Sequence, residues 1–205
     1  MSTRGFAPDN LQPGSFTFDD QNLALANAEI AKYPDGRQQS AVIALLDLAQ
    51  RQNAGWVPTA AIRMIAEMLA MPEIRAFEVA TFYSMFNLAP VGKHLVQVCR
   101  TTPCWLRGSD DLTDACRTHL GVELGEISDD GEFTVVEVEC LGACVNAPMA
   151  QINDHYYEDL TAERMTAVLD ALRAGDDVAI GTQEPQRQFS APIGGPTTLV
   201  ATGEG

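Results

Sequence analysis

Four of the five cysteines fall into two closely spaced pairs, and these pairs constrain the fold more than any other feature of the sequence. Four residues separate Cys99 from Cys104, three separate Cys140 from Cys144, and 35 residues lie between the pairs. Each pair begins at or just after an apolar segment typical of a strand. Open α/β sheets bind ligands at the carboxyl ends of their strands. We therefore expect a fold in which the two pairs converge on one site.

Four reduced thiolates repel one another, so a cation or a disulfide must neutralise such a group. Structural zinc suits the shorter spacing of Cys140 and Cys144. The wider spacing of Cys99 and Cys104 suits ligands that reach around a larger body, such as a [2Fe-2S] cluster. Disulfides of oxidoreductases usually have a C-x-x-C spacing, which neither pair shows. The spacing favours the cluster, with zinc and disulfides or unrelated core thiols as alternatives.

The remaining potential metal ligands are expected to be structural. Cys116 shares an apolar helical stripe with its neighbours and is predicted to be a buried thiol. His94, His119 and His155 have no spacing typical of a metal site. We expect backbone N–H groups of residues 101–102 and 141–143 to donate hydrogen bonds to the sulfurs of the two pairs.

Residues 19–86 show helical periodicity, interrupted by turn signals at 33–36, 53–55 and 71–72. Four short helices are expected, with Ser40 as the N-cap of the second. Aromatic residues in and after the fourth helix are predicted to belong to the core or to a docking face. They are Phe77, Phe82, Tyr83 and Phe86.

The pattern becomes extended near residue 91, and the second half reads as β-α-β-β-α. The expected elements are strands at 94–99 and 133–139, a hairpin over 149–157, and helices capped by Ser109 and by Thr161. The segment after Asp177 is rich in glycine and proline and is predicted to lack a core. The sequence thus predicts an α+β protein with a helical bundle at 15–90, an α/β domain at 91–176 and an extended tail at 177–205.

Charge and missing motifs narrow the function. The formal net charge is −15, and an acidic chain of this kind is not expected to bind nucleic acid. No secretory signal or apolar run long enough to span a membrane is visible, so a location on the cytoplasmic side is expected. No nucleotide-binding, nucleophile-elbow or zinc-protease motif occurs. A cluster without a substrate pocket would pass electrons between partner subunits, and no catalytic residue is predicted in this chain.

Four segments, 35–43, 78–86, 98–108 and 138–149, resemble the 24 kDa, or E, subunit family of respiratory NADH-quinone oxidoreductase, complex I. The resemblance extends over about residues 15–175. It implies a thioredoxin-like α/β domain after the helical bundle, with one [2Fe-2S] cluster. The cluster ligands implied by the resemblance are Cys99, Cys104, Cys140 and Cys144.

The resemblance also implies the surroundings of the chain. FMN and NADH would be bound by a partner subunit, next to a neighbouring iron-sulfur subunit, and this chain would have no complete active site of its own. The complex would hold the chain at the cytoplasmic side of the respiratory membrane without direct insertion. Arg100 stands where relatives often have a small residue, and its charge is expected to favour the reduced cluster. The tail at 187–199 is expected to become ordered along a neighbouring subunit.

Two other functions remain compatible with the sequence. The equivalent subunit of an NAD-dependent hydrogenase or formate dehydrogenase shares the cluster motifs. A zinc-stabilised interaction module with no redox role would use the same thiols.

Overall fold

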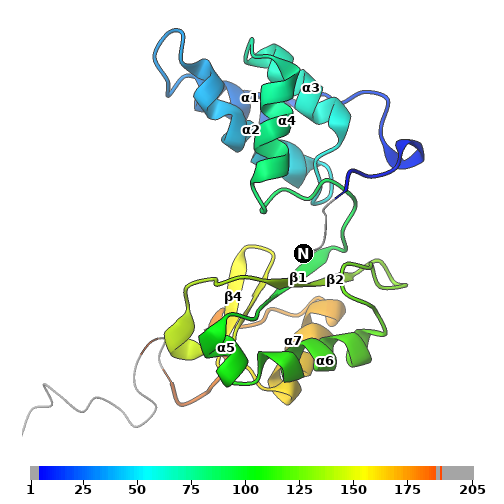
Figure 1. Ribbon diagram of the computed structural model, residues 1–205, viewed down its shortest axis with the longest axis vertical. Coiled ribbons are helices and arrows are strands. Elements are labelled where there is room, and N and C mark those ends of the chain that lie inside the picture. Colours follow the sequence, from blue (N-terminus) through cyan, green and yellow to red (C-terminus); the bar gives the residue numbers. More distant parts are fainter. Residues whose placement is uncertain (1–4, 188–189, 191–205) are drawn as a thin grey trace, which may run out of the picture. The chain divides into compact units, whose positions relative to one another are not determined.

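The change of periodicity near residue 91 coincides with a division of the chain into two compact units, Met1–Val91 and Gly92–Gly205. The computed structural model describes residues 5–187 and residue 190. Figure 1 shows the helical first unit and the mixed second unit, which we treat separately. The α+β class predicted from the sequence is confirmed.

The first unit consists of four helices preceded by irregular chain. They are α1 (Asp20–Ile30), α2 (Val42–Gln52), α3 (Thr59–Met68) and α4 (Glu73–Phe82), with short 3-10 turns η1 (Asp9–Leu11) and η2 (Gln38–Ala41). Apolar stripes at helical spacing meet in one core, where Leu45, Leu46, Ile62 and Ile65 are fully buried. The four predicted helices are confirmed. Of the aromatic set, Phe86 is buried in this core, whereas Phe82 is 79% exposed.

Two predicted helix caps are wrong. Ser40 lies within η2, which continues directly into α2. The N-cap position of α2 is therefore taken by Ala41, whose backbone is already helical, and no side chain caps this helix. Ser109 is the first residue of its helix, because Gly108 takes the N-cap position with a left-handed φ of 92°. The Ser109 hydroxyl is buried and has no hydrogen-bond partner among the described residues. The cap predicted at Thr161 is confirmed, since its side chain accepts a hydrogen bond from the N–H of Arg164.

The second unit contains a five-stranded sheet with the order β2-β1-β3-β4-β5. The strands are β1 (His94–Cys99), β2 (Phe133–Val138), β3 (Ala150–Ile152), β4 (His155–Glu158) and β5 (Gly181–Thr182). β1 is parallel to β2 and antiparallel to β3, and β3 and β4 form the predicted hairpin. The sheet is therefore mixed, with β1 as an interior strand.

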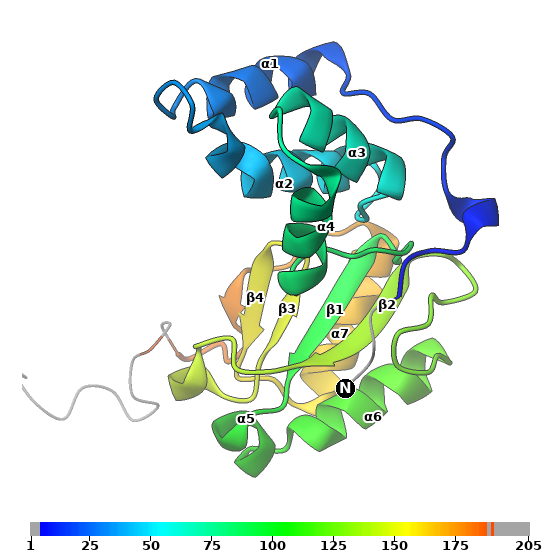
Figure 2. The ribbon, with the colours of Figure 1, turned by 45° about the horizontal axis from the view of Figure 1, so that its top comes forward.

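Helices α6 (Ser109–Leu120) and α7 (Ala162–Ala174) lie side by side on one face of this sheet, as Figure 2 shows. Their apolar faces pack with the sheet in a core that includes Val96, Phe133, Leu112 and Leu169. Cys116 is fully buried in the same core, so its predicted burial is confirmed.

Three short elements have no counterpart in the sequence pattern. They are α5 (Thr102–Leu106), η3 (Cys144–Asn146) and β5. β5 pairs in parallel with β4 although it lies beyond the last predicted helix, so the predicted tail contributes to the sheet. Positions 188–189 and 191–205 of that tail, which include most of the segment expected to order along a neighbouring subunit, lie outside the described residues. Within the described part of the chain, no helix is long and apolar enough to cross a membrane.

Candidate metal centre

The parallel pairing of β1 and β2 brings the two cysteine pairs to one edge of the sheet. Cys99 is the last residue of β1 and stands opposite Val138, the last residue of β2. Cys140 follows two residues later. Because both strands run in the same direction and end in register, the loops that follow them leave the sheet side by side.

The second cysteine of each pair lies in a short helical turn. Cys104 is in α5 and Cys144 is the first residue of η3. Cys99 and Cys104 are buried, whereas Cys140 and Cys144 are exposed and their sulfur atoms lie 3.7 Å apart. All five cysteines belong to the described residues, and all are free thiols. The site therefore has a buried pair on one side and an exposed pair on the other.

Backbone donors join the two loops at Cys99. Its sulfur accepts hydrogen bonds from the N–H groups of Thr101 and Leu141, which confirms the predicted donors at these two positions. The buried Thr101 hydroxyl also faces this sulfur and has no other partner among the described residues. Tyr156 donates its phenolic hydrogen to the Leu141 carbonyl at 2.7 Å. Tyr156 was not predicted as part of the site, because its position on β4 carries no motif.

The same contacts set the proton affinities of the thiols. Burial opposes ionisation of Cys99, but the donated hydrogen bonds outweigh it and hold the pKa of Cys99 below its usual range. Burial, together with the hydrogen bond to Cys99, raises the pKa of Cys104 to about 12. The hydrogen bond to Cys140 raises the pKa of Cys144. A metal group that bound these cysteines as thiolates would displace the thiol protons.

The donor set fits a [2Fe-2S] cluster. Two thiolates bound at about 2.3 Å to one tetrahedral metal lie about 3.8 Å apart, close to the 3.7 Å between Cys140 and Cys144. Across the described residues, no group of three or more His, Cys, Asp or Glu side chains is placed to hold a single metal ion. A [2Fe-2S] cluster takes four thiolates shared between two irons, so it does not need three donors around one point. The buried Thr101 hydroxyl is a further polar group next to the Cys99 sulfur, on the buried side of the site.

Arg100, next to Cys99, is not an isolated cation. Its guanidinium lies 2.5 Å from the carboxylate of Glu137 on β2, which also accepts a hydrogen bond from Thr113. Glu137 therefore offsets part of the charge of Arg100, and the effect of Arg100 on the reduced cluster stays a prediction. The sequence could not show this pair, whose members lie 37 positions apart.

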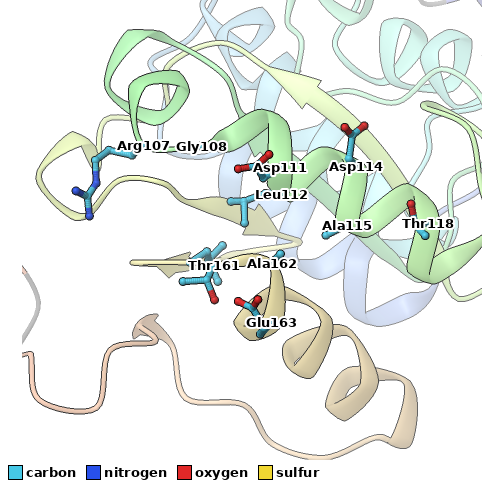
Figure 3. Close-up of a pocket in the computed structure, with 11 residues that line it drawn as sticks. Arg107, Gly108, Asp111, Leu112, Asp114, Ala115, Thr118, Thr161, Ala162 and Glu163 are labelled. Atoms are coloured by element: carbon cyan, nitrogen blue, oxygen red, sulfur yellow. The ribbon is translucent and has the colours of Figure 1, made fainter.

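One hollow of the second unit lies away from the cysteines. It lies between α6 and the start of α7, has a volume of about 640 Å³, and is lined by Asp111, Asp114, Glu163 and Arg107 among others (Figure 3). None of the five cysteines lines it. The Nε2 of His119 lies 2.6 Å from a carboxylate oxygen of Asp170, which can accept its hydrogen, so this contact joins α6 to α7.

The fold and the four thiols define a class of protein, the thioredoxin-like [2Fe-2S] ferredoxins. The family model with that description matches residues 26–173. The E subunit of NADH-quinone oxidoreductase from Rickettsia bellii is 58% identical over 164 residues, which cover 80% of this chain and 98% of that protein. The mitochondrial NADH dehydrogenase [ubiquinone] flavoprotein 2 of Dictyostelium discoideum is 47% identical over 191 residues, covering 93% of this chain and 77% of that protein.

The chain therefore belongs to the E subunit family of NADH-quinone oxidoreductase, within the thioredoxin-like [2Fe-2S] ferredoxins. The resemblance seen in the sequence is confirmed, and the cofactor of the family is one [2Fe-2S] cluster. A crystal structure of an NAD⁺-reducing [NiFe]-hydrogenase in the H2-reduced state has a TM-score of 0.59 at 20% identity. It covers 73% of this chain, which spans about a quarter, 24%, of the hydrogenase chain. At this identity the match shows the fold alone.

Proposed function

We propose that this chain is the [2Fe-2S] electron-transfer subunit of an NADH-quinone oxidoreductase, with Cys99, Cys104, Cys140 and Cys144 as the cluster ligands. One observation carries the proposal: the in-register ends of β1 and β2 bring these four thiols to one sheet edge, in a chain of the E subunit family. When bound, the cluster supplies a site that gains and loses a single electron.

The residues around the thiols support this role. The N–H groups of Thr101 and Leu141 stabilise negative charge on sulfur, which favours bound thiolate and the reduced state. The buried side of the site, at Cys99 and Cys104, keeps water from half of the ligands. The exposed side, at Cys140 and Cys144, leaves a short path for an electron from outside the chain.

The proposed electron donor is the flavin of a partner subunit that binds FMN and NADH, with a second iron-sulfur subunit next to it. Exposed apolar side chains beside the cysteines support a partner at this edge, since Trp105 is 55% exposed, Leu106 70% and Val145 61%. The helical domain at 15–90 and the tail at 177–205 are proposed as further docking surfaces of the domain at 91–176.

In this arrangement the chain is one part of an enzyme and has no complete active site of its own. It would be held at the cytoplasmic side of the respiratory membrane through the complex. The acidic charge of the chain supports contact with proteins rather than with nucleic acid or with anionic lipid.

The equivalent subunit of an NAD-reducing hydrogenase is the second candidate. The fold match to such a hydrogenase is compatible with this candidate, and identity to the NADH-quinone oxidoreductase subunits is far higher. Purification of the chain with its native partners separates the two. Recovery of quinone-module proteins supports the first candidate, and recovery of a nickel-iron subunit supports the second.

The test of electron transfer uses the iron-loaded full chain under anaerobic conditions. With NADH alone the cluster should stay oxidised and give no EPR signal. With NADH and the flavin-binding partner, the signal of the reduced cluster should appear. The Cys116→Ser variant, which retains all four proposed ligands, is the matched control and should behave as the wild type. Reduction by NADH without the partner, or none with it, contradicts the proposal.

A further inference from the structure

A buried ion pair lies behind the turn that carries Cys144. The guanidinium of Arg187 and the carboxylate of Asp159 are 2.5 Å apart, and each side chain is only 7% exposed. Burying two charges costs several kcal/mol unless close geometry and additional hydrogen bonds compensate. The neighbours of this pair show which part of the molecule it stabilises.

Asp159 holds the last residue of the turn by both side chain and backbone. One carboxylate oxygen accepts hydrogen bonds from the side-chain amide of Asn146 at 2.8 Å and from the hydroxyl of Thr182 at 2.6 Å. The N–H of Asp159 donates to the carbonyl of Asn146 at 2.8 Å. Asn146 is 2% exposed and ends η3, two residues after Cys144. Asn146 is therefore held by the residue that follows β4, and Thr182 of β5 holds that residue in turn.

Arg187 holds the middle residue of the same turn. Its second terminal nitrogen donates to the carbonyl of Val145 at 2.9 Å. Arg187, Cys144 and Val145 also line one small hollow of about 340 Å³. Both residues that follow Cys144 are thus held by groups from the end of the sheet, while the loop on the other side of Cys144 contains no helix or strand.

We propose that Arg187 and Asp159 are positioning residues for Cys144, so that residues 183–187, which follow β5, are part of the cysteine site. The inference rests on the proposed function, because it assumes that Cys144 binds the cluster. They act through Asn146 and Val145, to which they are hydrogen-bonded. Groups that orient metal ligands typically change metal affinity or activity by about 10–100-fold when they are removed, and we expect an effect of this order here.

The test measures the rate at which the iron-loaded full chain loses iron to a chelator, together with the EPR spectrum of the reduced sample. Arg187→Met should lose iron about 10–100-fold faster than the wild type and shift the EPR g values. Arg187→Lys, which retains the charge, should restore part of the retention. Arg173→Met is the matched control, because it breaks an ion pair with Asp130 in the same unit and should leave both readouts unchanged.

A general loss of stability would not change the EPR signal of the protein that remains folded. The spectrum therefore distinguishes the positioning of Cys144 from a general contribution to fold stability. Where Arg187→Met leaves too little folded protein, the double variant Asp159→Asn/Arg187→Met, which buries no unpaired charge, should show the same faster loss and shifted spectrum. Wild-type retention with an unchanged spectrum in the folded variants overturns the inference alone. A wild-type chain without iron overturns the proposed function, and the inference with it.

Discussion

Replacement of Cys116 by serine separates a buried structural thiol from a cluster ligand. The Cys116 side chain is fully buried between α6 and the sheet, and burial raises its pKa to about 12, so it is a neutral thiol at pH 7. Serine puts a more polar hydroxyl in the same apolar surroundings. A buried hydroxyl without a good partner costs about 1–3 kcal/mol, and a bond to the preceding helical turn would place the cost at the lower end.

This cost predicts a modest loss of stability and no loss of iron. For a chain of this length, about 1–3 kcal/mol lowers Tm by about 2–12 °C. Thermal unfolding monitored by circular dichroism gives the shift, and iron and sulfide analysis gives the cluster content. Cys116→Ser should retain two irons and two sulfides per chain with the wild-type EPR spectrum.

Cys104→Ser and Cys144→Ser are the companion variants. Each removes a proposed ligand, so each should lose the cluster or change its spectrum. Cys144 is exposed, so its substitution should cost the iron-free chain little folding free energy. The opposite pattern, with iron lost from Cys116→Ser and retained in Cys144→Ser, would refute the ligand assignment.

Three further predictions concern the electrostatics, the accessibility and the backbone of the second unit. Glu137→Gln leaves the charge of Arg100 uncompensated and should raise the reduction potential of the cluster by on the order of tens of millivolts. Redox titration measures this potential, and a lower value in the variant contradicts the predicted increase. Iodoacetamide should label Cys140 and, more slowly because its pKa is raised, Cys144 in the iron-free chain, and neither in the loaded chain, as read by mass spectrometry. Equal labelling in both states argues against ligation. Gly92→Ala places a Cβ 2.4 Å from a backbone carbon of β2 and should cost about 3 kcal/mol in urea unfolding; wild-type stability would show that the strand can shift.

The strands next to the cysteines could be predicted because their burial produces a strong local pattern. Residues 94–99 are apolar on both faces, as an interior strand must be, and the structure places β1 between β2 and β3. Because both cysteine pairs begin at strand ends, the sequence also predicted that Cys99 lies near the loop that follows β2. Helices α6 and α7 were equally visible, since each ends at a glycine with a left-handed φ.

Contacts that depend on distant, polar residues could not be predicted. Arg100 with Glu137 and Arg187 with Asp159 join positions 37 and 28 residues apart, and no periodicity links them. β5 has only two residues, too few for an alternating pattern. The preference of serine for the N-cap position did not apply at Ser109. Gly108, with its left-handed φ, takes that position, and the helix begins at Ser109.

The assignment of four thiols to one binuclear cluster is tested most directly by iron and acid-labile sulfide analysis of the purified, anaerobically prepared full chain, combined with EPR after reduction by dithionite. We expect a brown protein with two irons and two sulfides per chain, and a single spin-one-half signal after the uptake of one electron. A colourless protein that contains zinc, or no metal at all after reconstitution with iron and sulfide, would contradict the electron-transfer role.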